Sequence, residues 1–164
     1  MLEPVSPQRN RLGIAGLVLS ASGFVFTVMH EGYTSQAVSP VKGDVPTIGF
    51  GTTSGVKMGD KITPPLAVER ALIDEEQDEL GIHKCIHVPL TQGEYDSDVD
   101  GAYNAGVHAF CESSIAKKQN AGDYSGACQD YLAWLITVKG VENKGLLNRR
   151  LAEYNMCLGT QPKG

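Results

Sequence analysis

Two carboxylic acids in the first third of the chain, Glu31 and Asp44, stand in contrasting settings. Glu31 follows a very apolar run, where desolvation favours the protonated form of a carboxyl group. Asp44 lies in a Gly-rich stretch with polar neighbours, where a carboxylate stays ionised. Hydrolysis of a glycoside uses such a pair, because one group must protonate the leaving oxygen while the other remains charged. An Asp in this setting can also serve only to form a turn, so composition alone leaves both interpretations open.

The apolar run before Glu31 covers residues 12–29 without a charged side chain, and Arg9 and Arg11 precede it. Its length and the basic residues on its amino-terminal side predict a membrane-targeting segment that starts in the cytoplasm. Many of its residues are small or carry a hydroxyl group and contribute little transfer free energy. We therefore expect the segment to enter a bilayer but to hold there weakly. A cleaved signal peptide and a buried core helix are the alternatives.

The remaining chain predicts one small sheet followed by helices. Residues 40–59, rich in Gly, Pro and Thr, indicate a hairpin or a three-stranded sheet. Four helices should follow. The first begins at Thr63-Pro64 and stops at Gly81, and the second begins with capping-box spacing at Thr91 and ends before Gly106. The third is capped by Asp123 and contains Cys128, Leu132 and Trp134, and the last runs from about Asn143 to Gly159 with Leu147, Leu151, Tyr154 and Leu158 along one side. This order predicts an α+β fold with a small sheet on the amino-terminal side and a mainly helical carboxy-terminal lobe. We expect two regions, the membrane-targeting residues 1–29 and a single domain over residues 30–164.

Composition narrows the function further. The 164 residues are 41% hydrophobic, which suits one domain with one core, and the formal net charge of −5 argues against a nucleic-acid binder. The four cysteines are scattered, without metal-ligand spacing, so we expect no metal site and two disulfides in a chain that leaves the cytosol. Three pairings are possible. We expect Cys85–Cys111 and Cys128–Cys157, the second because both cysteines belong to the final helices.

Glu31-Gly32 followed by Val45-Pro46-Thr47-Ile48-Gly49-Phe50-Gly51 resembles the active-site signature of phage-type lysozymes, glycoside hydrolase family 24. The resemblance continues, in the family's order, through Tyr95-Asp96, Ala102-Tyr103-Asn104-Ala105-Gly106, Ala121-Gly122-Asp123-Tyr124, Trp134 and Gly145-Leu146-Leu147-Asn148-Arg149-Arg150. It implies a lysozyme-like fold for nearly everything between His30 and Gly159. The leader resembles the signal-arrest-release segment of secreted phage endolysins, which inserts in the host inner membrane and later frees the enzyme into the periplasm. The cysteine that some relatives carry inside this segment is absent from residues 12–29.

The resemblance assigns roles to individual residues. The family's catalytic set is a Glu, an Asp and a Thr, which Glu31 and Thr47 match at the first and last positions. At the usual position of the Asp this chain has Pro40, with Ser39 beside it. Asp44 is the only Asp between Glu31 and Thr47, and we expect it to take this role. Otherwise a water held by Thr47 and other polar groups must serve.

Two helix residues also match family positions. Arg149 matches an arginine that pairs with the catalytic Glu, and Asn104 matches a polar position in the cleft. A surface arginine and a helix-terminal asparagine next to Gly106 are the plain alternatives. The family has apolar residues where this chain has Asp98 and Gly101. A buried unpaired Asp costs several kcal/mol, so we expect Asp98 to be exposed, to be paired, or to weaken the core.

The implied activity is hydrolysis of the β-1,4 bond between N-acetylmuramic acid and N-acetylglucosamine, which lyses the host cell. The inverting mechanism of the family would require a water between two carboxyl groups roughly 6.5–9.5 Å apart. We expect a monomer that acts on peptidoglycan glycan strands, with no metal or organic cofactor. A lytic transglycosylase that uses Glu31 alone and a non-catalytic cell-wall-binding module are the alternatives. A pore-forming protein is excluded, because the chain has only one short apolar span.

Overall fold

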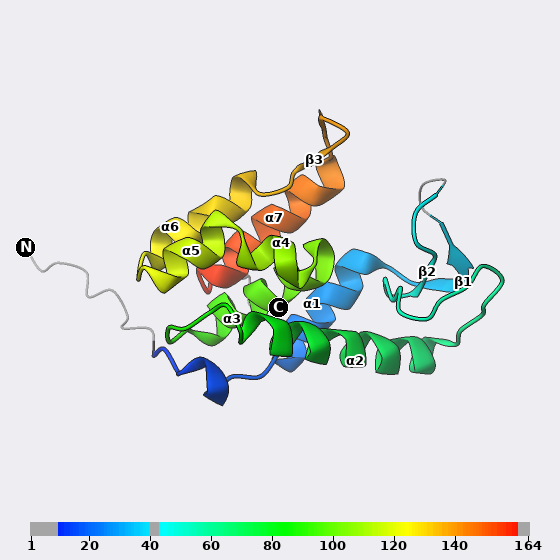
Figure 1. Ribbon diagram of the computed structural model, residues 1–164, viewed down its shortest axis with the longest axis horizontal. Coiled ribbons are helices and arrows are strands. Elements are labelled where there is room, and N and C mark those ends of the chain that lie inside the picture. The colour runs from blue at the N-terminus through cyan, green and yellow to red at the C-terminus, as the bar shows by residue number, and fades with distance from the viewer. Residues whose placement is uncertain (1–9, 40–42, 161–164) are drawn as a thin grey trace, which may run out of the picture.

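The computed structural model of the chain describes residues 10–39 and 43–160. Its elements in chain order are η1 (Ile14–Gly16), α1 (Ala21–Glu31), β1 (Thr34–Val38), β2 (Thr47–Gly49), α2 (Pro64–Ile82), α3 (Gln92–Ala105), α4 (Val107–Cys111), α5 (Ser114–Asn120), α6 (Tyr124–Asp130), η2 (Tyr131–Ala133), β3 (Thr137–Val138), β4 (Val141–Glu142) and α7 (Lys144–Cys157). Figure 1 shows most helices gathered in one lobe, with β1 and β2 at one side and α2 running from that sheet back to the helices. This arrangement confirms the predicted α+β class.

The strands form two small antiparallel ribbons. β1 pairs with β2, with Thr34 opposite Gly49 and Val38 opposite Thr47, and β3 pairs with β4. We expected the first ribbon within residues 40–59. It begins earlier, because its first strand is Thr34–Val38. Residues 40–42 lie outside the described part of the chain. A small core covers this ribbon, formed by Ala37, Ile48, Val56, Ile62 and Ala67.

Local signals predicted the start of the central helix correctly. Thr91 Oγ1 accepts a hydrogen bond from the Glu94 backbone N–H, and Glu94 Oε2 accepts one from the Thr91 backbone N–H, which completes the capping box of α3. The expected stop at Gly81 is wrong, because α2 continues to Ile82. A Cβ at Gly81 would lie 2.6 Å from a methyl carbon of Val107, so this glycine serves the close approach of α4. The helix capped by Asp123 ends at Asp130, before Trp134.

The expected stripe of the last helix is only partly present. Tyr154 and Leu158 are half-buried against the helical core. Leu151 is 50% exposed, and the buried positions of α7 are Arg149, Arg150, Glu153, Met156 and Cys157. The reason is the partner helix, because α3 presents carboxylate and amide groups that pair with the arginines. The face of α7 that packs inward therefore carries charged residues as well as the apolar Met156 and Cys157.

The apolar run over residues 12–29 is part of the folded body in this structure. It contains η1 and most of α1, and the backbones of Leu12 and Leu90 exchange two hydrogen bonds. Ser20 donates from its backbone N–H and its hydroxyl to Asp96 on α3, and a Cβ at Gly23 would lie 2.8 Å from Asp96 Cγ. Within residues 10–39 and 43–160, no helix combines the length and apolar character that crossing a bilayer requires.

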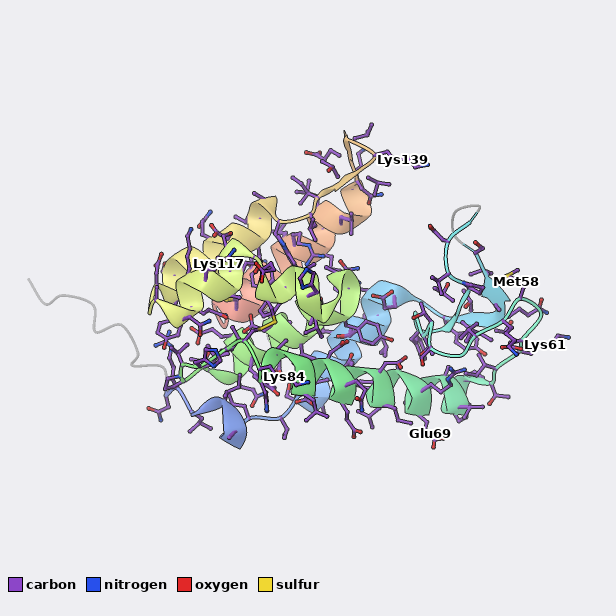
Figure 2. The ribbon with its side chains drawn as sticks, in the orientation of Figure 1. Met58, Lys61, Glu69, Lys84, Lys117 and Lys139 are labelled. Carbon is purple, nitrogen blue, oxygen red and sulfur yellow. A yellow bond between two sulfur atoms is a disulfide. The ribbon has the colours of Figure 1, made fainter. Side chains whose placement is uncertain are left out.

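Two disulfides fasten the helical lobe with the pairing that we expected. Cys85, just after α2, is bonded to Cys111 at the end of α4, and Cys128 of α6 is bonded to Cys157 at the end of α7. Figure 2 shows the side chains over the whole molecule, with Lys139 at the tip of the β3–β4 hairpin.

The two core positions that depart from the family have different environments. Asp98 is fully buried, and its Oδ1 accepts hydrogen bonds from Gln119 Nε2 at 3.0 Å and from the Tyr131 hydroxyl at 2.9 Å. Asp98 is therefore paired through one oxygen. At Gly101 the ring of Trp134 occupies the space of a side chain, since a Cβ would lie 3.2 Å from its Cζ3.

Candidate active site

Glu31 stands at the end of α1, where the helical lobe meets the first ribbon. It is the last residue of the helix, and Gly32, with φ of 70°, turns the chain toward β1. The side chain of Glu31 is 19% exposed and borders a hollow of about 350 Å³. The lining residues come from α1, α3, β3 and the start of α7: His30, Glu31, Asn104, Val138, Asn143, Gly145, Leu146 and Arg149. Glu31 thus combines partial burial with access to solvent, as a group that must reach a substrate requires.

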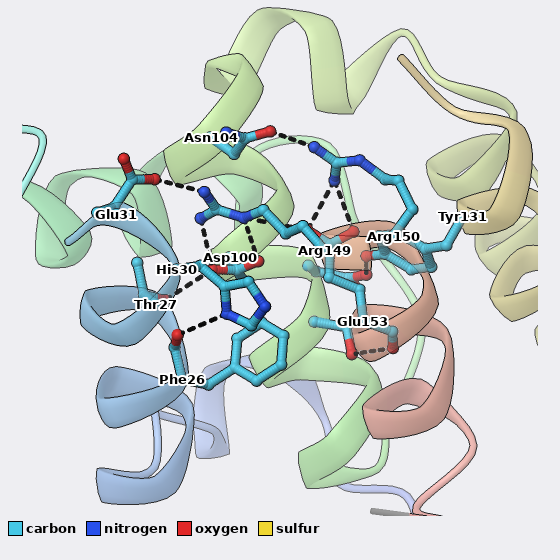
Figure 3. Close-up of polar contacts among 12 residues, drawn as sticks. Phe26, Thr27, His30, Glu31, Asp100, Asn104, Tyr131, Arg149, Arg150 and Glu153 are labelled. Carbon is cyan, nitrogen blue, oxygen red and sulfur yellow. Dashed lines mark hydrogen bonds and ion pairs between the residues drawn. The ribbon is translucent and has the colours of Figure 1, made fainter. Parts of the chain in front are cut away.

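Arg149 joins Glu31 to a second, deeper carboxylate. Its Nη1 donates to Glu31 Oε1 at 2.5 Å, while its Nε and Nη2 donate to the two oxygens of Asp100 at 3.0 and 2.7 Å (Figure 3). Thr27 of α1 donates to Asp100 Oδ1 at 2.8 Å. Burial raises the pKa of Asp100, but the adjacent Arg149 charge outweighs it and holds that pKa below its ordinary value. Burial lowers the pKa of Arg149, whereas Asp100 and Glu31 raise it, with a net increase.

Arg150 makes a parallel set of contacts. Its Nη1 donates to both carboxylate oxygens of Glu153 at 2.6 Å, and its Nη2 donates to the side-chain oxygen of Asn104. Burial, and then the charge of Asp100, raise the pKa of Glu153 well above its ordinary value. The oxygen of Asn104 is therefore engaged by Arg150, and Asn104 borders the hollow in a fixed orientation.

A second hollow is bordered by Gly51. It has a volume of about 370 Å³ and is lined by Gly51, Thr53, Ser54, Asp74, Gln77, Asp78, Ala102, Tyr103 and Gly106. Tyr103 of α3 donates from its hydroxyl to the backbone carbonyl of Phe50 at 2.6 Å, which ties the helical lobe to the loop after β2. Burial, and then the charge of Asp74, raise the pKa of Asp78 to about 7.

Gly51 lies close to the second carboxylate oxygen of Glu31, Oε2. Its φ is 89°, and a Cβ there would lie 2.9 Å from Glu31 Oε2. We expect Gly51→Ala to lower the rate of any reaction in which Glu31 takes part at least about tenfold, because small displacements of a reacting group are costly. The strain of the left-handed backbone should cost about 1–2 kcal/mol of stability. Initial rates and denaturant unfolding measure the two effects.

Gly55→Ala is the matched control for this prediction. Gly55 also has a positive φ, of 70°, but nothing lies within 4 Å of a Cβ at that position. The control should lose similar stability and keep its rate. Equal rate losses in both variants would show that backbone strain, not contact with Glu31, is responsible.

The remaining expected catalytic residues lie on the first ribbon. Asp44 is exposed, and its backbone carbonyl accepts a hydrogen bond from the Ser39 hydroxyl at 3.2 Å. Thr47 is the first residue of β2, is half-buried, and donates to the Val38 carbonyl at 3.4 Å. The structure thus brings Glu31, Asn104 and Arg149 to one hollow and places Asp44 and Thr47 outside its lining. Pro40 lies outside the described residues.

Sequence reasoning missed the buried partners of the two arginines. Asp100, Thr27 and Glu153 hold Arg149 and Arg150 in place, yet none of them was expected at the site. The charge pattern of two helices could have indicated these partners. The consecutive arginines in one helix and the alternating acids Asp96, Asp98 and Asp100 in another are charges that a packed interface must pair.

Comparison with known proteins gives consistent matches over most of the chain. The family described as phage lysozyme matches residues 28–153. The SAR-endolysin of Pseudomonas phage phiKMV is 38% identical over 148 residues, which cover 88% of this chain and 89% of that protein. The endolysin of Acyrthosiphon pisum secondary endosymbiont phage 1 is 35% identical, covering 82% and 94%. The solved endolysin from Escherichia coli O157:H7 phage FAHEc1 is 37% identical with a TM-score of 0.79, covering 90% and 98%. The family match includes Glu31, Asp100 and Arg149.

Proposed function

This chain belongs to the phage lysozyme family and is a peptidoglycan-cleaving enzyme, and from that premise we propose that it hydrolyses the β-1,4 bond between N-acetylmuramic acid and N-acetylglucosamine. The observation that carries the proposal is the position of Glu31, partly buried against Arg149 and open to a hollow of about 350 Å³. A carboxyl group in this position can protonate the oxygen of a leaving sugar. We assign Glu31 as the general acid.

The attacking water is the second requirement. In an inverting hydrolase it is activated by a carboxylate on the opposite face of the sugar ring. We propose that Asp44 and Thr47, on the first ribbon, hold this water once a glycan strand lies between the ribbon and the helices. Arg149 keeps the Glu31 carboxyl in place, and Asn104, fixed by Arg150, contributes to binding the sugar.

A lytic transglycosylase is the second candidate. It needs only the acid, because a hydroxyl of the sugar closes an anhydro ring in place of water. The exposure of Asp44 and its absence from the lining of the hollow at Glu31 favour this alternative. Product chemistry separates the two reactions.

The decisive experiment is cleavage of purified peptidoglycan with products identified by mass spectrometry. We expect sugars with reducing ends from the wild type, and a rate at least about tenfold lower in Asp44→Asn, because a general base contributes about 10²–10⁴. Asp60→Asn, an exposed acid in the loop before α2, is the control. Anhydro products would establish the transglycosylase. An undiminished Asp44 variant would place the second group elsewhere, and folded protein without products would favour a binding module.

We also propose that the enzyme reaches peptidoglycan through the host inner membrane and acts in the periplasm as a monomer. The uncharged residues 12–29 and the name of the phiKMV relative, a SAR-endolysin, support this route. The docked position of α1, with Ser20 bonded to Asp96, suits the released form. Fractionation of expressing cells should find the chain first with the inner membrane and then in the periplasm. A chain found only in the cytoplasm would contradict the route.

A further inference from the structure

The contact between Glu31 and Arg149 raises a problem for an acid catalyst. A full positive charge 2.5 Å from a carboxyl group favours its ionised form, which has no proton to give. Solvent screens the charge of Arg149 only weakly, because its side chain is only 5% exposed. An acid at this position needs a group that offsets the cation without displacing it.

Asp100 has the geometry to do this. Its side chain is fully buried, and it binds the guanidinium through two parallel hydrogen bonds, which leaves Nη1 directed at Glu31 (Figure 3). Two-point arginine–carboxylate pairs are among the strongest in proteins. The hydroxyl of Thr27 fixes the orientation of Asp100. The guanidinium that faces Glu31 thus belongs to a nearly neutral pair.

We propose that Asp100 is a positioning residue that offsets the charge of Arg149 and fixes the guanidinium in the place from which it orients Glu31. The inference rests on the proposed role of Glu31 as general acid. It predicts that the Asp100 charge sets the upper end of the pH range in which the enzyme works.

Other titratable groups surround the site on every packed element. On α1, His30 bonds the Phe26 carbonyl, and on α3 the pKa of Tyr103 is raised by burial and by the charge of Glu31. On α2, burial raises the pKa of Glu75 to about 8. On α7, Glu153 stands 3.7 Å from Arg149 Nε and is bonded to Arg150. Asp100 is the carboxylate in two-point contact with Arg149, so its charge should dominate.

The test compares pH–rate profiles of glycan cleavage for the wild type and Asp100→Asn. Asparagine keeps the size of the side chain but removes the negative charge, so Arg149 then acts on Glu31 as a full cation. We expect the alkaline limb to move down by about one pH unit or more. The loss should be about tenfold at pH 8 and small at pH 5. A merely structural role would lower the rate equally at all pH values.

Asp98→Asn is the matched control. Asp98 is on the same helix and equally buried, but its partners are Gln119 and Tyr131 rather than Arg149. Its alkaline limb should stay at the wild-type position. An unmoved limb in Asp100→Asn, or the same movement in both variants, would overturn the inference.

Arg149→Lys provides an independent test if Asp100→Asn does not fold. A lysine ammonium cannot make the two-point contact with Asp100 and also reach Glu31, so the limb should move up rather than down. A downward movement would contradict the proposal. Glu31→Gln separates the two hypotheses, because a fully active Glu31→Gln would refute the proposed function itself, whereas a Glu31-dependent enzyme with an insensitive Asp100→Asn would refute only this inference.

Discussion

Glu31→Gln should lower the rate of glycan cleavage by about 10²–10⁴-fold, the usual contribution of a general acid. The glutamine oxygen can still accept the hydrogen bond from Arg149 Nη1, so the side chain should keep its place. It has no acidic proton, however, and the leaving oxygen must depart as an anion. Release of reducing sugars from purified peptidoglycan measures the loss, and circular dichroism checks the fold.

The matched control is Glu69→Gln. Figure 2 shows Glu69 on the outer side of α2, and its side chain is exposed. This variant makes the same chemical change away from the two hollows and should retain full activity. A Glu31→Gln enzyme within about threefold of the control would remove Glu31 from the role of general acid.

The second large effect concerns stability. Asp98 lies in the core with Oδ2 unpaired, and the side-chain oxygen of its neighbour Gln119 also lacks a donor among the described residues. Burial raises the pKa of Asp98 to about 8 against the hydrogen bonds from Gln119 and Tyr131, which lower it. We expect Asp98→Asn to stabilise the protein at pH 8.5 by roughly 2–5 kcal/mol relative to the wild type, since one pKa unit corresponds to about 1.4 kcal/mol.

The direction in which stability changes with pH follows from the proton that Asp98 binds. The folded state has the higher pKa, so it binds the proton more tightly than the unfolded state between pH 4 and 8, and stability falls as the pH rises through that range. Asp98→Asn removes this part of the decline, while Glu75, with a pKa of about 8, leaves some of it. Urea unfolding at pH 5 and pH 8.5 measures the difference, with exposed Glu76→Gln as control. An equal decline in wild type and Asp98→Asn would contradict the prediction.

Local sequence signals predicted elements whose causes are themselves local. The capping box at Thr91 lies within four consecutive residues, and both of its hydrogen bonds are present. The expected stripe of α7 is only partly present, because a hydrophobicity pattern does not show which groups a neighbouring helix offers as partners. Arg149 and Arg150 are buried because Asp100 and Asn104 of α3 face them, across a long stretch of chain.

The site was predictable to the extent that family motifs carry it. Glu31, Asn104 and Arg149 were expected from the resemblance and border one hollow. Asp100 was missed because its role depends on a contact with Arg149 of α7, which lies 49 residues further along the chain. The assignment of Asp44 stays a prediction, since its exposed position on the ribbon leaves its relation to a bound glycan to be measured.

The two disulfides reinforce the two sides of the contact between Glu31 and Arg149 unequally. Arg149 is carried by α7, whose end is bonded to α6 through Cys157 and Cys128, whereas α1, which carries Glu31, is held by hydrogen bonds and packing alone among the described residues. We therefore expect a reducing agent to affect activity from a distance. Reduction should loosen the anchorage of Arg149 and so weaken its support of Glu31, although no cysteine is among the residues that line either described hollow.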